Sequence, residues 1–352
     1  MIRRPPRSTP SNSSAASDVY KRQELIAQYP LKDRDHSRLL VLNRKTGHID
    51  HMTFDYLPDL LHPGDLLVFN ETKVISARLK GKKASGGKAE IFLLNQKDES
   101  HWECLVKPGR RIRPGTVVHF SDTFKAEIID VLEEGGRLVR FTWEGDFWDV
   151  LEKYGQIPLP PYVHREPEPS DKENYQTVYA RKYGSVAAHT AGLHFTRDIL
   201  DRLSQKGVES VYVNLRVGLG TFRPVKTERI DQHTMHREFC EISTDTANAV
   251  NKALNEGRRV IAVGTTSTRT LESFAVNGKV HSGGHFTDIF IYPGGRPIQI
   301  ISGLITNFHM PKSTLLMLVS AFAGYENIMN AYQIAVQEKY RFFSYGDAMA
   351  IF

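Results

Sequence analysis

Cysteine and long apolar runs are scarce in this sequence. Only two cysteines, Cys104 and Cys240, occur in 352 residues, and they form no CxxC pair. Their small number and wide separation argue against a disulfide framework or a cysteine-rich zinc site, and fit a reducing compartment. The longest strongly apolar stretch, residues 315–323, contains Ser320 and is too short to cross a bilayer. We therefore expect a cytoplasmic protein with no membrane span.

Positive charge is also modest once it is located along the chain. The formal net charge is +6, but residues 1–23 carry +4 of it, which leaves +2 for the rest. The overall charge is thus weak evidence for nucleic-acid binding. Residues 1–23 are rich in Arg, Ser and Pro, without the apolar core of a secretory signal. We expect this segment to be a non-native or disordered extension that resembles read-through of sequencing-adapter DNA.

Alternating strand and helix patterns dominate the remainder of the chain. Its length favours two domains. Residues 24–72 and 151–352 predict an α/β domain in which helices cover a mostly parallel sheet. The expected strands span residues 37–44, 48–54, 65–70, 211–217, 258–264, 286–292 and 304–308. The expected helices span residues 56–61, 196–207, 244–255, 268–275, 314–323 and 327–338.

The pattern differs between residues 73 and 150. Six short alternating strands, separated by Gly-rich turns and without a long helix between them, predict an inserted small β-barrel domain. One turn of this region, KPGRRIRPG, carries Lys107, Arg110, Arg111 and Arg113. Contact with an RNA backbone and a solvated hairpin tip are equally good interpretations of this basic turn.

An uncharged segment rich in small residues, GSVAAHTAGLHFT at residues 184–196, is the first candidate for a ligand site. Its alanines and Gly192 allow close approach of a ligand or of other backbone. His189, Thr190 and His194 supply imidazole and hydroxyl groups. The segment ends at Thr196, which is expected to cap the next helix, and such strand-to-helix junctions are common ligand sites in α/β folds.

Cations stand at three helix starts, where the helix dipole disfavours them. Arg269 follows Thr265, Thr266, Ser267 and Thr268; Lys312 precedes Ser313; Arg197 follows Thr196. The cost of each placement is about 0.3–1 kcal/mol. The pattern indicates that a carboxylate or phosphate binds at Arg269 and Lys312. For Arg197, next to Asp198, a solvated side chain is an equally good interpretation.

Two Gly-rich segments do not match known nucleotide-binding motifs. GTTST lacks the Gly-Lys-Ser/Thr of a Walker A loop. Gly218 and Gly220 do not begin a dinucleotide fingerprint, because Pro224 would fall inside the required helix. We interpret RVGLGTFRP as a strand that runs into a tight loop close to a ligand, although an ordinary sharp turn explains it equally well.

Imidazoles are the candidates for proton transfer. His233, His236 and Glu238 lie close together, but the spacing lacks HExxH or a third standard ligand, so metal binding is the less favoured interpretation. His236 with Glu238 could act as general acid and base near neutral pH, and His309 is a similar candidate. No Ser/His/Asp order supports a hydrolase triad. The residues alone thus predict an enzyme that binds a ligand with an anionic end and uses imidazoles rather than a metal.

Several long motifs, in fixed order, resemble one known family and cover residues 24–352. They are ELIAQYP, RDHSRLLVL, NETKVISARL, IPLPPY, GSVAAHTAGLHFT, VGLGTFRPV, HTMHREFCEI, VGTTSTRTLESF, TDIFIYPG, LITNFHMPKSTLLMLVSAFAG and YRFFSYGDAMAIF. Together they closely resemble the S-adenosylmethionine:tRNA ribosyltransferase-isomerase family of queuosine biosynthesis.

The resemblance implies an unusual reaction. Enzymes of this family transfer and isomerise the ribosyl moiety of S-adenosylmethionine onto 7-aminomethyl-7-deazaguanine at the tRNA wobble position. The product is epoxyqueuosine-tRNA, and adenine and methionine are released. S-adenosylmethionine is then a consumed co-substrate, tRNA is the macromolecular partner, and no metal is required. We expect a monomer.

The resemblance also suggests roles for matched positions. His194 or His309 would be the base, Asp288 would orient the ribose hydroxyls, and His236 with Glu238 would form a reserve acid/base pair. Thr190 and Gly192 would line the purine pocket. The expected substrate-binding set further includes Gly218, Gly220, Thr265, Thr266, Ser267, Arg269, Lys312 and Ser313. The expected RNA-binding set is Lys107, Arg110, Arg111 and Arg113.

This chain departs from the family pattern at four places, one of which is the family's usual first strand, largely absent before Glu24. The family usually has Pro at the position of His189 and commonly His at that of Arg216, and the loop over residues 294–303 is atypical. Two other functions stay open from the sequence alone. One is a related transferase or nucleosidase that acts on a free small molecule, and the other is a non-catalytic RNA-binding protein, which lacks support from RNP-type aromatic motifs.

Overall fold

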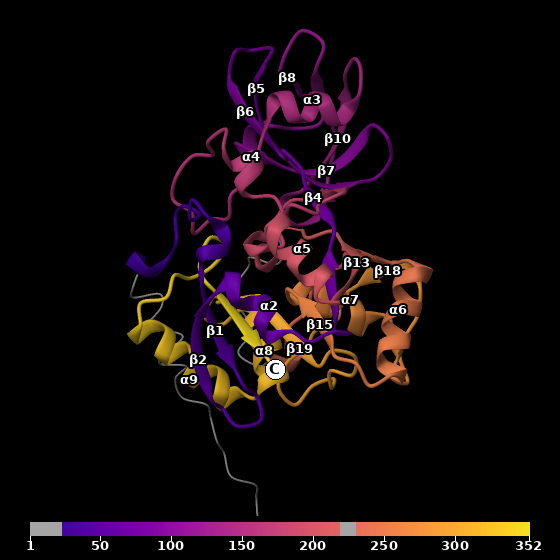
Figure 1. Ribbon diagram of the computed structural model, residues 1–352. Coiled ribbons are helices and arrows are strands. Elements are labelled where there is room, and N and C mark those ends of the chain that lie inside the picture. The colour runs from indigo at the N-terminus through magenta and orange to yellow at the C-terminus, as the bar shows by residue number, and fades with distance from the viewer. Residues whose placement is uncertain (1–22, 219–229) are drawn as a thin grey trace, which may run out of the picture.

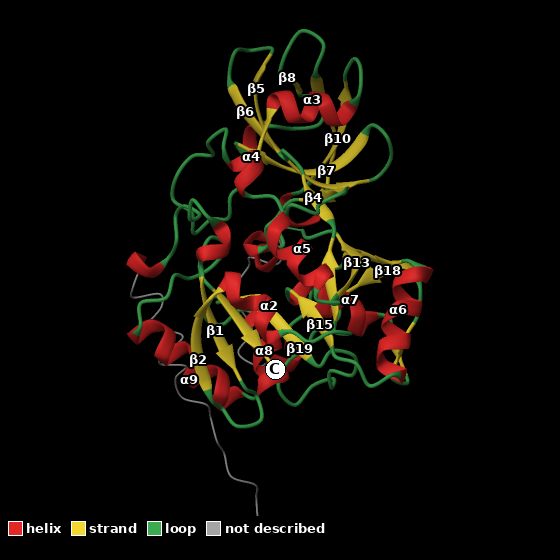
Figure 2. Cartoon of the chain, viewed as in Figure 1, coloured by secondary structure: helices red, strands yellow, loops and turns green. Residues whose placement is uncertain are grey.

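The computed structural model describes residues 23–218 and 230–352. A β-barrel and a large sheet flanked by helices make up most of this part of the chain (Figure 1). Figure 2 shows the barrel strands grouped at the top of the view and the helices packed around the larger sheet below. The expected extension over residues 1–23 falls almost entirely outside the described residues.

Nine strands within the described ranges form the large sheet, in the order β18-β14-β13-β3-β15-β19-β20-β1-β2. Their bounds are Arg38–Leu42 (β1), Ile49–Thr53 (β2), Leu66–Asn70 (β3), Glu209–Leu215 (β13), Glu238–Ile242 (β14), Val260–Val263 (β15), Gly283–Thr287 (β18), Gly303–Asn307 (β19) and Ala348–Ile351 (β20). The neighbours β13, β3, β15 and β19 run parallel, as do β20 and β1. The other four pairings are antiparallel.

The sheet is therefore mixed, and the expectation of a mostly parallel sheet is not confirmed. Only its centre has the parallel order that strand and helix alternation predicts. The difference arises at the flanks, where β14 and β18 pair as antiparallel neighbours and the C-terminal β20 inserts between β19 and β1. The strand expected over residues 286–292 ends at Thr287.

Five longer helices accompany this sheet in the described part of the chain. They are Arg197–Gln205 (α5), Thr244–Asn255 (α6), Thr265–Ser273 (α7), Thr314–Ala323 (α8) and Tyr325–Gln337 (α9). Short helices span Leu57–Leu60 (α2), Phe147–Tyr154 (α3) and Asp171–Asn174 (α4). Thr196 caps α5 as expected, because its side chain accepts from the Ile199 amide. Ser243 and Ser313 cap α6 and α8 in the same way.

The central strands of the large sheet are buried on both faces. Every residue of β3, β15 and β19 is buried, including Thr306 and Asn307 at the end of β19. This burial fits parallel strands that are covered by helices on both sides. Two polar side chains at the end of a fully buried strand therefore need partners within the protein.

The predicted barrel is confirmed. Six strands between residues 78 and 142, all described, close into an antiparallel ring in the order β5-β6-β7-β10-β9-β8, with β5 paired to β8. Their bounds are Arg78–Lys83 (β5), Lys88–Gln96 (β6), His101–Lys107 (β7), Val117–His119 (β8), Lys125–Val131 (β9) and Arg137–Thr142 (β10). Closure removes the exposed strand edges of a small sheet.

The junction between barrel and sheet differs in detail from the prediction. The stretch expected as the first barrel strand is split: Thr72–Val74 (β4) pairs with Lys182–Ser185 (β12), and β5 begins only at Arg78. At the other end, Gly155–Gln156 (β11) adds to β5. The domain division at residues 73 and 150 stays a prediction. The chain leaves β12 directly into the small-residue segment that contains His189 and His194.

Candidate active site

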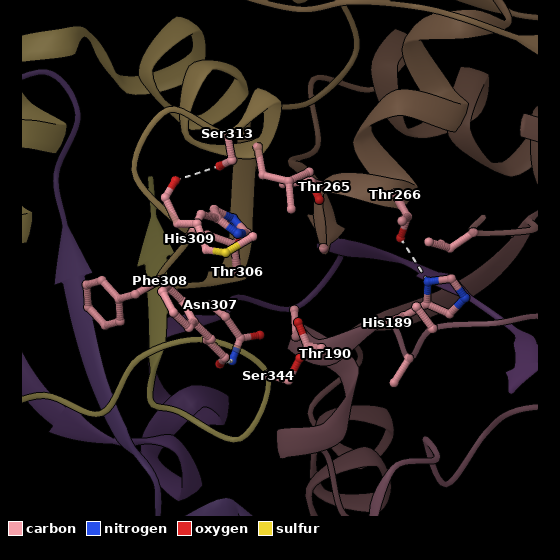
Figure 3. Close-up of a pocket in the computed structure, with 18 of the residues that line it drawn as sticks. His189, Thr190, Thr265, Thr266, Thr306, Asn307, Phe308, His309, Ser313 and Ser344 are labelled. Carbon is pink, nitrogen blue, oxygen red and sulfur yellow. Dashed lines mark hydrogen bonds between the residues drawn. The ribbon is translucent and has the colours of Figure 1, made fainter. Parts of the chain in front are cut away.

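A cavity lies where β15 and β19 end, between the 3-10 helix η6 (Thr190–His194) and the starts of α7 and α8 (Figure 3). Both apolar and polar residues line it. The apolar lining comes from Tyr162, Ala187, Ala188, Ala191, Val217, Phe308, Met310, Leu315 and Phe343. The polar side chains are His189, Thr190, Thr265, Thr266, Thr306, Asn307, His309, Ser313 and Ser344.

Two helix N-termini contribute to the lining. Gly264, at a φ of 89°, is followed by Thr265 and Thr266 in the first turn of α7. Ser313 caps α8: its hydroxyl donates to the Met310 carbonyl (2.7 Å) and accepts from the Leu316 amide (3.2 Å). Free amides and the positive end of a helix dipole favour an anionic group, and α7 and α8 bring both to one cavity.

His309 lies in the cavity wall and is 8% exposed. Its Nε2 is 2.8 Å from Oγ1 of Thr306, and its backbone amide donates to the Tyr332 hydroxyl at 2.6 Å. Burial lowers the pKa of His309 to about 3. The ring is therefore neutral near pH 7.

His194 is held at both ring nitrogens. Nδ1 is 2.7 Å from the Ser37 hydroxyl, and Nε2 is 3.1 Å from Nδ2 of Asn307. The ring also stacks on Phe54 with 5.0 Å between centroids. Burial lowers the pKa of His194 to about 4. His194 does not line this cavity, but its Nε2 contacts Asn307, which does.

His189 does line the cavity and is 4% exposed. Its Nδ1 is 3.2 Å from the Thr266 hydroxyl, whereas its buried Nε2 has no hydrogen-bond partner. Burial lowers the pKa of His189 to about 3. This third neutral imidazole therefore ties the small-residue segment to the start of α7 (Figure 3).

Arg269 forms a buried ion pair. Its Nη1 donates to Oε2 of Glu238, while Oε1 of Glu238 accepts from the Gly218 amide at 3.1 Å. Neither side chain is more than 5% exposed. Arg269 and Glu238, expected to bind an anion and to transfer protons, are thus partners of each other outside the cavity lining.

The other expected site residues lie outside the cavity. Asp288, His236 and Lys312 are exposed. The Ser267 hydroxyl of α7 donates to the carbonyl of Val263, at the end of β15. Gly192 packs against Tyr179, where an added Cβ would lie 1.9 Å from the phenol oxygen. Gly220 falls outside the described residues, and no group of three His, Cys, Asp or Glu suited to a metal occurs among those described.

The four basic residues expected to bind RNA, Lys107, Arg110, Arg111 and Arg113, are all exposed on the barrel. Lys107 also lines a groove of about 980 Å³ between β5, β6 and β8. The charged and aromatic side chains of this groove are Lys80, Lys82, Lys88, Glu90, Lys107, His119, Phe120 and Asp122. Because Glu90 is paired with Arg78, the free charge of the groove is mainly positive.

Sequence reasoning missed the cavity residues Thr306, Asn307 and Ser344. The available signal was the polar pair that ends the apolar strand LITNF, since buried strand positions normally exclude polar side chains unless they are partnered. Ser344 had no such signal.

A cavity with apolar walls beside two helix N-termini and neutral imidazoles is suited to a ligand with both an apolar and an anionic part. The comparisons with known proteins agree. The family model described as queuosine biosynthesis protein matches residues 20–351, and this chain belongs to that family. The family resemblance of the sequence motifs is therefore confirmed.

Two curated relatives share one name. The S-adenosylmethionine:tRNA ribosyltransferase-isomerase of Desulfitobacterium hafniense is 53% identical over 94% of this chain and 96% of its own length. The enzyme of that name from Carboxydothermus hydrogenoformans is 56% identical over 95% and 98%. The crystal structure of S-adenosylmethionine tRNA ribosyltransferase from Thermotoga maritima is 36% identical, covers 94% of this chain and 97% of its own, and has a TM-score of 0.54.

Within the described residues, no helix is long and apolar enough to span a membrane.

Proposed function

We propose that this chain catalyses the reaction for which its relatives are named. It transfers and isomerises the ribosyl moiety of S-adenosylmethionine onto 7-aminomethyl-7-deazaguanine of tRNA, and releases adenine and methionine. The observation that carries the proposal is the cavity that joins two helix N-termini, an apolar wall and the neutral His309. S-adenosylmethionine is consumed as a co-substrate.

The lining suggests how S-adenosylmethionine lies in the cavity. Its methionine carboxylate fits the helix starts at Thr265, Thr266 and Ser313, where backbone amides can donate to it. Its purine fits the wall formed by the alanines of residues 187–191. Thr190 adds a further hydroxyl to the lining (Figure 3).

His309 is the residue we propose as the base. The sulfonium acidifies the neighbouring 5′ C–H, and a neutral imidazole can remove that proton. If Thr306 accepts from Nε2–H, the lone pair of Nδ1 is available to the substrate. His194 is less suited to this role, because both of its ring nitrogens already have partners. Adenine must leave with a proton, and the acceptor amine must be neutral to attack.

The barrel groove is the surface that we propose for the tRNA backbone. Lys82, Lys88 and Lys107 bring positive charge to one concave surface that also presents Phe120. Phosphates pair with such cations, and an aromatic ring can stack on an unpaired base. Arg110, Arg111 and Arg113 extend the positive surface along the neighbouring turn. The reaction would take place in the cytoplasm, on a monomer.

The competing function is adenine release from a free small molecule on the same scaffold. Incubation of the full chain with S-adenosylmethionine, with and without tRNA that carries the aminomethyl-deazaguanine base, separates the two. The proposal expects adenine only when the modified tRNA is present. Equal release without tRNA would favour the competing function.

A further inference from the structure

Asn307 has a carboxamide whose orientation is fixed by its surroundings. The residue ends β19 and is 2% exposed. One end of the carboxamide faces the carbonyl oxygens of Phe343 at 3.2 Å and Asp347 at 3.5 Å. Carbonyl oxygens only accept hydrogen bonds, so that end must be Nδ2. Oδ1 is thereby fixed on the opposite side.

The same argument assigns the tautomer of His194. Nδ2 of Asn307 also donates to His194 Nε2 at 3.1 Å, so this ring nitrogen carries no proton. The proton of the neutral ring is then on Nδ1, which donates to the Ser37 hydroxyl at 2.7 Å. Both hydrogens of the Asn307 amide are used in this arrangement. The carboxamide is therefore held against rotation from two sides.

Oδ1 of Asn307 is buried and has no hydrogen-bond partner. A buried acceptor left unpaired costs free energy, and native structures rarely tolerate one without a reason. Asn307 lines the cavity, and Figure 3 shows its carboxamide on the side that faces Thr190. The unpaired acceptor is thus available to a ligand in this cavity.

We propose that Oδ1 of Asn307 accepts a hydrogen bond from an N–H or O–H group of bound S-adenosylmethionine and selects for ligands that carry this donor. Ser37 and His194 are positioning residues, because they act only through Asn307. The inference rests on the proposed function and deepens it. Three kinds of donor of the co-substrate have the required chemistry: the 6-amino group of adenine, the ribose hydroxyls and the α-ammonium group of the methionine part. Oδ1 of Asn307 is one acceptor, so it cannot by itself make two hydrogen bonds to the edge of a purine.

Binding measurements with analogues test the assignment. S-adenosylmethionine is compared by calorimetric titration with its analogues that lack the 6-amino group, the 2′-hydroxyl, the 3′-hydroxyl or the α-ammonium group. The full-length protein should bind one of these about 10- to 100-fold more weakly, because the analogue leaves Oδ1 unpaired. In Asn307→Ala the penalty for that same analogue should disappear. The analogue that loses affinity identifies the donor.

Asn214→Ala is the matched control. Asn214 is also 2% exposed, lies on β13 and is absent from the cavity lining. The Asn214→Ala variant should bind the affected analogue more weakly than S-adenosylmethionine by the same factor as the wild-type protein. His194→Phe keeps a ring against Phe54 but removes the acceptor for Asn307, so it should reduce the discrimination without weakening the binding of the donor-free analogue.

The inference is overturned if every analogue shows the same affinity ratio in the wild-type protein and in Asn307→Ala. This outcome leaves the proposed function intact provided that the wild-type protein binds S-adenosylmethionine and releases adenine with modified tRNA. If the wild-type protein does not bind S-adenosylmethionine at all, the proposed function fails together with the inference.

Discussion

The guanidinium of Arg269 and the carboxylate of Glu238 form an ion pair that links α7 to β14 with almost no exposure to solvent. Removing one partner of such a pair leaves a buried charge uncompensated, which costs about 3–5 kcal/mol. Glu238→Gln should therefore lower the free energy of unfolding by about this amount in urea titrations. Glu241→Gln, on the same strand but paired with Lys182 at the surface, should cost less than about 1 kcal/mol.

A second variant separates the effect of charge balance from that of packing. Replacing both Arg269 and Glu238 by Met should be less destabilising than Glu238→Met alone, because no unpaired charge is then buried. If the loss of stability in the double variant equals the sum of the losses in the two single Met variants, this account of the pair is contradicted.

His309→Gln tests the proposed base. Loss of a positioned general base lowers turnover about 10²- to 10⁴-fold. We expect this loss in the rate of adenine release at saturating substrate, with little change in the affinity for S-adenosylmethionine. His281→Gln, at an exposed position outside the cavity, is the control and should act like wild type. A His309→Gln enzyme with more than half of the wild-type turnover would eliminate His309 as the base.

The buried imidazoles make stability depend on pH. Burial holds the pKa values of His189 and His309 at about 3 and that of His194 at about 4 in the folded protein, below the ordinary value near 6.5. The unfolded chain therefore binds more protons as the pH falls below about 6.5, and the folded state loses stability down to about pH 4 through His194 and down to about pH 3 through His189 and His309. Each imidazole contributes a slope of up to about 1.4 kcal/mol per pH unit.

Urea titrations between pH 4.5 and 7.5 measure this slope. His189→Gln should reduce it by the contribution of one imidazole. A matched substitution of the exposed His281 should leave it unchanged, and equal slopes for the His189 variant and the wild-type protein would refute the assignment.

If tRNA binds in the barrel groove, its affinity should fall as the salt concentration rises. Replacing Lys82, Lys88 and Lys107 by Gln should weaken tRNA binding and lower the slope of log K against log salt by about 0.7–0.9 for each phosphate that is no longer neutralised. Affinity for S-adenosylmethionine should not change, since none of these residues lines the cavity. Removing the three exposed lysines Lys45, Lys252 and Lys279 is the control for general charge. If both triple variants bind tRNA equally, the groove is not the binding surface.

Local patterns predicted much of this fold. The barrel, the cap at Thr196 and the buried strand at residues 304–308 follow from periodicity and capping chemistry, which are local properties. The pairing of β20 between β19 and β1 could not be predicted in this way. Its four residues pair with strands that are distant in sequence, and tertiary packing decides the direction of that pairing.

The site residues, like the fold, were predictable only where local sequence features determine them. His309, Thr265, Thr266 and Ser313 were found because helix starts and loop imidazoles leave a signal in the sequence. The role of His194 depends on Ser37 and Asn307, which are 157 and 113 residues away in the chain. Sequence spacing does not reveal which ring nitrogens already have hydrogen-bond partners. Arg269 was expected to bind a ligand, but the structure pairs it with Glu238.

The most direct test of the central claim is a stoichiometric one. The full chain is incubated with S-adenosylmethionine and tRNA that carries 7-aminomethyl-7-deazaguanine, and adenine release is compared with the mass of the modified nucleoside. The account predicts one adenine released for each nucleoside that gains the ribosyl-derived mass, and no release with tRNA that lacks the aminomethyl group. Adenine release without any mass gain on the tRNA would contradict it.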